Sequence, residues 1–252
     1  MNLPVAFMVE SRKAWASTVF PVATLLVVAG VGFLAGAMMA AVRAGNEQVV
    51  AQVGPLAGET AWQTYLNVSI SIAAAAVLLS VGVILSWVFG REFADGTAPG
   101  LFATAVPRRD TALAKLLVVL LWGGAMAVAL TGVVGLVGLV LPLGAIDGAI
   151  VAQMSRLGIL TVLSTLLATP AAWAATLGRG LLPGIATTIG LVVLAQVGVV
   201  AGVGAWVPLA APALWALDPQ SVSRGQLVIT GAVPVFFGML TMGAWARLQL
   251  DR

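Results

Sequence analysis

The chain has 252 residues, of which 61% are hydrophobic and only 8% are charged, and its formal net charge is +3. A mean hydropathy of +1.09 excludes an ordinary soluble domain, which could not bury so much apolar side chain. Because the chain contains neither Cys nor His, disulfides, thiolate chemistry and imidazole metal sites are excluded as well.

Residues 1–18 predict an amphipathic helix that lies in the membrane interface. On such a helix Glu10, Arg12 and Lys13 are expected to face water. The residues expected to face lipid are Val5, Met8, Val9 and Trp15. The alternative is a disordered tail that merely supplies positive charge.

Six apolar stretches follow, and each reaches the ~20 residues that a helix needs to cross the hydrocarbon core of a bilayer. The sequence therefore predicts an all-α polytopic membrane protein with a six-span domain over residues 19–246. The predicted spans are 19–41, 62–89, 113–140, 157–177, 184–205 and 227–246.

The basic residues predict which way the chain sits in the membrane. With six spans, nine of the twelve Lys and Arg fall on the side of the two termini, and only Arg43, Arg156 and Arg224 fall on the other. Cytoplasmic loops carry such an excess of Lys and Arg, so both termini are expected in the cytoplasm. The basic pI then reflects membrane topology, and no nucleic acid is needed to explain it.

The polar side chains in the middle of the spans are uncharged. The middle of every span lacks Asp, Glu, Lys and Arg, so the sequence contains no evident proton wire. Ser and Thr in these positions serve in the first place as helix-packing residues. If some of the polar groups line a cargo pathway, the candidates are Asn67, Ser71, Thr165 and Gln196.

The sequence disfavours an enzyme. It lacks the G-x-x-x-x-G-K-[ST] motif that would bind ATP, and the His that usually activates an intramembrane serine is absent. Glu92 and Asp95 are too few to hold a catalytic cation. We therefore expect no cofactor and no metal on this chain.

Residues 91–111 form the long charged connection on the side of the termini. Asp95-Gly96 predicts a turn, and Thr97 can cap a short helix over 98–105. Leu101 and Phe102 would be exposed on that helix, which suggests a docking site for a soluble partner.

Directly after the second span, the order Glu92, Asp95-Gly96-Thr97, Pro107, Arg109 and Lys115 resembles a motif of ABC type-2 exporter permeases. The N-terminal Glu-Ser-Arg-Lys-Ala-Trp is similar to the amphipathic connecting helix of those proteins. Small residues, Ala-Pro-Gly, stand in the segment where many of those permeases carry larger aliphatic ones.

The resemblance implies that residues 91–111 couple the chain to a separate ATP-binding cassette subunit, which would bind ATP and Mg. It also implies a second permease subunit, identical or not, so that two permeases pair. The residues expected at the contact with the ATPase are Glu92, Asp95, Gly96, Thr97, Leu101, Phe102, Pro107 and Arg109.

Residues 206–224 contain three prolines and two tryptophans and look like the re-entrant extracellular segment of that family. A simple extracellular loop is the alternative.

The leading hypothesis is the permease subunit of an ATP-driven exporter in a bacterial plasma membrane. It would move an amphipathic drug, antibiotic or lipid-like cargo outward by alternating access and so contribute to antibiotic resistance. The preference for Arg over Lys is typical of a GC-rich bacterial genome. A non-transporting scaffold, immunity or sensor subunit is the alternative. An ion-driven carrier is a third reading, with Asp147 and Arg156 as its candidate ionisable groups.

Overall fold

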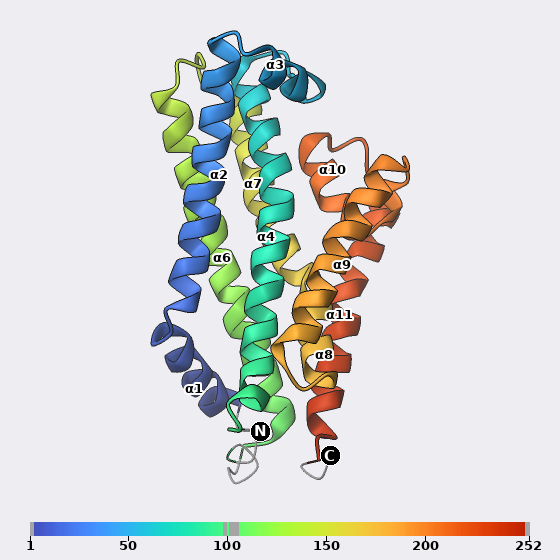
Figure 1. Cartoon of the computed structure of the whole chain (residues 1–252). Helices are drawn as coiled ribbons and strands as arrows, with labels where there is room; N and C mark the ends of the chain where they lie inside the picture. Colours follow the sequence, from blue (N-terminus) through green and yellow to red (C-terminus); the bar gives the residue numbers. More distant parts are fainter. Residues whose placement is uncertain (1–2, 98–99, 101–105, 250–252) are drawn as a thin grey trace.

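The computed structural model describes residues 3–97, 100 and 106–249, and these residues form a bundle of long helices without a strand (Figure 1). Six helical stretches are long and apolar enough to cross a membrane, which confirms the predicted all-α class with six spans. They are α2 (Val19–Arg43), α4 (Ala61–Ala94), α6 (Arg108–Val140), α7 with α8 (Gly148–Leu167 and Thr169–Leu177), α9 (Leu181–Val200) and α11 (Arg224–Ala246).

Shorter helices lie at the ends of the bundle. They are α1 (Leu3–Trp15), α3 (Glu47–Val53), η1 (Gly54–Leu56), η2 (Gly204–Trp206) and α10 (Ala211–Leu217). Figure 1 shows α1 at the same end as the last turn of α11, whereas α3 and α10 lie toward the other end. We call the end that holds α1 the terminal face and the opposite end the distal face.

Several spans extend further than their apolar stretches. The helix α4 continues to Ala94, α6 begins at Arg108, and α7 begins at Gly148, where the Asp147 carboxylate accepts a hydrogen bond from the backbone of Ile150 at 2.9 Å. Hydropathy marks only the part of a helix that is apolar, while backbone hydrogen bonds carry the helix on into its charged ends. One consequence is that Arg156 lies within α7 and not in a connecting loop.

The centre of the bundle is α4, which packs against α2, α7, α8 and α9. Lipid is as apolar as the helices, so close packing, and not exclusion from water, holds such helices together. At Gly82 a Cβ atom would lie 2.3 Å from the Thr188 hydroxyl of α9, and at Gly90 it would lie 2.6 Å from the backbone carbon of Gly180. These two glycines let α9 approach α4 directly.

The fourth span is interrupted between α7 and α8 at Ala168. Pro170 follows two residues later, and a proline has no N–H to continue the helical hydrogen bonds. The predicted span 157–177 therefore consists of two helical pieces.

The segment 206–224 folds back on the bundle through α10, which contacts α7 and α4. Its Ala211, Pro212 and Ala216 are buried. Arg156 Nε of α7 donates to the carbonyl of Ala216 at 3.1 Å and holds α10 in place. That this segment is re-entrant stays a prediction.

Candidate functional site

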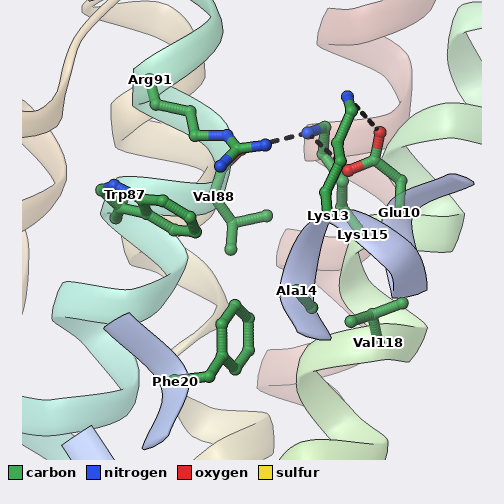
Figure 2. Close-up of a pocket in the computed structure, with 9 residues that line it drawn as sticks. All are labelled: Glu10, Lys13, Ala14, Phe20, Trp87, Val88, Arg91, Lys115 and Val118. Carbon is green, nitrogen blue, oxygen red and sulfur yellow. Dashed lines mark hydrogen bonds and ion pairs between the residues drawn. The ribbon is translucent and has the colours of Figure 1, made fainter. Parts of the chain in front are cut away.

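At the terminal face, α1 packs on the first turns of α6, and ion pairs bring four charged side chains of α1, α4 and α6 together. Figure 2 draws three of them, Glu10, Lys13 and Lys115. We call Glu10, Lys13, Glu92 and Lys115 the charge cluster. Glu10 and Ala6 are one helical turn apart on the buried face of α1, so docking of that helix carries the carboxylate inward.

Lys115 is the centre of the cluster and is only 1% exposed. Its Nζ donates to Glu10 Oε2 at 2.9 Å, to Glu92 Oε1 at 2.9 Å and to the Val88 carbonyl at 3.2 Å. An ammonium group has three N–H donors, so these contacts use them all. A buried charge is tolerated when it is both paired and fully hydrogen-bonded, and Lys115 meets both conditions.

Lys13 completes the ring of alternating charges. Its Nζ donates to Glu10 Oε1 at 2.8 Å and to Glu92 Oε1 at 3.0 Å. Burial alone would lower the pKa of Lys13, but the hydrogen bond and the negative charge of Glu10, joined by those of Glu92, outweigh burial and raise that pKa above its ordinary value. The cluster therefore pairs two ammonium groups with two carboxylates.

Glu92 also connects the cluster to the segment that follows α4. Its second oxygen, Oε2, accepts a hydrogen bond from the Thr97 hydroxyl at 2.8 Å. Between them, Asp95 caps the C-terminus of α4, and Gly96 has a φ of 66°, a value that glycine adopts readily. The start of the predicted coupling segment is thus fixed to the same carboxylate that holds α1.

Aromatic packing ties the cluster to the rest of the terminal face. The Trp245 ring of α11 lies 5.7 Å from Lys115 Nζ and meets the Phe89 ring edge-on at 5.7 Å. Trp245 Nε1 donates to the Thr176 hydroxyl of α8 at 3.0 Å. Four helices, α4, α6, α8 and α11, therefore meet around this indole.

The cavity beside the cluster has a volume of only about 10 Å³. That is the space of one water molecule at most, so the cluster is not a ligand pocket. What the arrangement can do is hold α1, α4 and α6 as one unit.

The structure corrects one prediction for α1 and supports another. Glu10 and Lys13, which we expected to face water together with Arg12, both lie in the cluster, and Glu10 is only 6% exposed. Arg12 is exposed. Val5, Met8, Val9 and Trp15 are exposed, as a lipid-facing surface requires. The position of α1 in a membrane interface stays a prediction.

The predicted coupling residues do not share one surface. Glu92 is 3% exposed, so another subunit cannot contact it directly. The residues that are exposed at the terminal face are Asp95, Gly96, Thr97, Pro107 and Arg109. Leu101 and Phe102, with most of the predicted helix 98–105, lie outside the described residues.

The four predicted pathway residues are not brought together around one cavity among the residues described. Asn67 donates to the Leu56 carbonyl at 3.0 Å and accepts from Gln153 at 2.7 Å, which makes it a packing residue near the distal face. Ser71 is half-buried on α4, and Gln196 is exposed on α9. Thr165 is buried and donates to the Thr161 carbonyl at 2.8 Å.

Thr165 does line an apolar pocket of about 250 Å³ between α6, the α7–α8 break and α11. Thr169 lies in the same wall, and its hydroxyl is buried without a hydrogen-bond partner in the described part of the chain. The other described residues of the wall are apolar, among them Leu116, Pro234 and Met239. An occupant would be neutral and apolar, with one hydrogen-bonding group for Thr169.

Asp147 and Arg156, the candidate ionisable groups of the ion-driven carrier hypothesis, both have structural partners. Asp147 caps α7, and Arg156 is bonded to Ala216. Within the described ranges, no three acidic side chains are grouped so that they could hold a metal ion.

A family model described as ABC-2 family transporter protein matches residues 7–196, about three-quarters of the chain, from α1 into α9. No curated protein matches the chain. The matched region contains the whole charge cluster, four complete spans and most of the fifth, α9. The chain therefore belongs to the ABC-2 transporter family and is a multi-pass transmembrane component of a transporter.

Proposed function

We propose that this chain is the permease subunit of a bacterial ATP-driven exporter that works as a pair of permeases with two ATP-binding subunits. The family match supports a permease that works with an ATP-binding subunit. The observation that supports coupling to that subunit is the charge cluster, which joins the N-terminal helix to the spans on either side of residues 95–107.

The terminal face would be the cytoplasmic face in this proposal. Of the eleven Lys and Arg among the described residues, eight belong to segments at the terminal end, in accordance with the excess of basic residues in cytoplasmic loops. The C-terminal end of α11 and the exposed residues Asp95, Gly96, Thr97, Pro107 and Arg109 would then be accessible to a soluble ATPase.

ATP and Mg would be bound by the partner subunit. When the ATPases close, they would push on residues 91–111, and Glu92 would pass that displacement to Lys115 of α6 and, through Lys115 and Lys13, to Glu10 of α1. Because ion pairs and hydrogen bonds at 2.8–3.0 Å connect these helices, they would tilt together and switch the permease between inward-facing and outward-facing states.

The cargo would be amphipathic and neutral, such as a drug, an antibiotic or a lipid-like molecule. The pocket beside Thr165 and Thr169 supports this class, because no charged side chain is present among its described residues to pair with an ionic cargo. Val235 and Met239 at its edge are 60% and 56% exposed, so the pocket is open toward the lipid side of α11.

The test is a double substitution in the predicted docking helix, Leu101→Asp with Phe102→Asp. Export of a reporter cargo should be lost while the amount of protein in the membrane stays unchanged. A matched control is Glu47→Ala with Gln48→Ala, two exposed residues of α3 at the distal face, which should leave export intact. Unchanged export by the Asp variant would contradict the proposed docking.

A further inference from the structure

At the terminal face, a groove of about 740 Å³ lies between the end of α8 and the last turns of α11. Two arginines, Arg179 and Arg247, line it together with the apolar side chains of Trp173, Phe236, Met239 and Leu240. This groove is separate from the charge cluster and adjoins the pocket beside Thr169 at Met239, which lines both. The coupling mechanism does not use it.

The backbone of Arg179 has an unusual conformation. Its φ is 50°, and it is the one residue other than glycine with positive φ in the described part of the chain. Gly178 and Gly180 stand on either side of it, yet Arg occupies the position that a glycine would fill without strain. Strain of this kind persists where the side chain has a use.

Part of that use is structural. Arg179 Nη2 donates a hydrogen bond to the carbonyl of Gln249, just beyond the end of α11, at 2.9 Å. A guanidinium has five N–H donors, so one bond to a carbonyl leaves donors for a further acceptor. None of the described residues that line the groove is acidic, and neither arginine is in an ion pair within the described ranges.

The apolar floor indicates what kind of anion would fit. Phe236 and Met239 are 54% and 56% exposed and continue the groove onto the outer face of α11, which faces lipid if this helix spans the membrane. A free inorganic anion would gain nothing from this surface, whereas a phospholipid would use both parts. Its phosphate would pair with the arginines, and an acyl chain would cover the aromatic and aliphatic side chains.

We propose that this groove binds one anionic phospholipid, with the headgroup phosphate between Arg179 and Arg247 and an acyl chain against Trp173 and Phe236. The site goes beyond the proposed export function and does not depend on it, since it needs only that the terminal face lies at a membrane surface.

The experiment is native mass spectrometry of the full chain, released from detergent with equal amounts of dioleoyl phosphatidylglycerol and dioleoyl phosphatidylcholine. The wild-type protein should retain one phosphatidylglycerol in preference to phosphatidylcholine. The double variant Arg179→Gln with Arg247→Gln should lose roughly tenfold or more of that preference, as expected for two basic residues near an anionic headgroup. The control is Arg43→Gln with Arg224→Gln, two exposed arginines toward the distal face, which should keep it.

A second pair of variants separates lipid binding from a purely structural role of Arg179. Arg179→Gly relieves the positive φ and removes the charge, so it should raise the thermal stability in detergent and still lose the preference. Arg179→Lys keeps the charge and should retain most of the preference. Each of three results would overturn the proposal. They are equal retention of both lipids by the wild type, an unchanged preference in the double variant, and displacement of the bound lipid by inorganic phosphate at constant ionic strength.

Discussion

Lys115 Nζ lies 2.9 Å from Oε2 of Glu10, a carboxylate that is 105 residues away in the chain. The contact joins the helix that precedes the first span to the first turns of the third span, at a point where Glu92 of the second span also meets the same ammonium group. The ion pair therefore ties α1 to the end of the second span and to the start of the third.

Lys115→Met should destabilise the protein by about 3–5 kcal/mol, because it leaves Glu10 and Glu92 buried with one ammonium partner fewer. Thermal unfolding in mild detergent measures the effect. Adding Glu10→Gln to the Lys115→Met variant should recover part of the loss, since it removes one of the uncompensated charges. If Glu10→Gln lowers the stability by the same amount in the Lys115→Met variant as in the wild type, the two residues do not interact.

Docking of α1 should depend on pH in the alkaline range. The pKa of Lys13 is raised above its ordinary value of 10.5, so the stabilisation that charged Lys13 contributes is complete below pH 10.5 and is lost as the pH rises through the higher folded-state value. The stability difference between wild type and Lys13→Met should be constant from about pH 8 to 10 and shrink above that range. If the stability difference between wild type and Lys13→Met shrinks already below pH 9, the two carboxylates do not keep Lys13 protonated.

The packing of α4 against α9 gives a prediction with a matched control. Gly90→Ala should destabilise the bundle by about 1–3 kcal/mol, because the new methyl would lie 2.6 Å from the backbone carbon of Gly180, which cannot rotate away. Gly30→Ala in α2 meets nothing within 4 Å and should change stability by about 1 kcal/mol or less, toward greater stability. Equal effects of the two substitutions on thermal unfolding would contradict the close contact of α4 and α9.

The hypothesis of an ion-driven carrier can be tested by substituting Asp147 and Arg156. Asn caps a helix about as well as Asp, so Asp147→Asn removes the charge and keeps the cap of α7. Together with Arg156→Gln it should leave transport unchanged in a reporter-cargo assay, because both residues have structural roles. Loss of transport with normal expression of this variant would favour the carrier.

The sequence was sufficient to predict the class of the fold and the six spans, because a bilayer requires ~20 apolar residues per helix and the chain has six such stretches. It predicted the ends of the helices less well. The α7 helix begins at Gly148, nine residues before the stretch 157–177, because a helix cap such as Asp147 acts where the hydropathy is already low. The break at Ala168 lies in an apolar run, and only Pro170 signals it.

The charge cluster could be predicted only in part. Glu92 and Lys115 belong to the motif that suggested the family, but the expected role of Glu92 was contact with another subunit. Lys115 stands two residues inside the apolar stretch 113–140. Because a lysine within a span needs an acidic partner, its position in the sequence signals that an ion pair forms there. No such signal in the sequence marks Glu10. An amphipathic helix can turn either side of its charged face toward the protein, and only the packing of α1 on α6 decides which side is buried.

Co-purification tests whether this chain transmits the work of a separate ATPase. The most direct measurement is purification of the tagged chain in mild detergent after expression with its neighbouring genes, followed by identification of the bound proteins and an ATPase assay. A stoichiometric ATP-binding subunit should be bound, and its ATPase activity should respond to the permease and lose that response in Lys115→Met. A chain that purifies alone, under conditions in which a known exporter stays intact, would contradict this role.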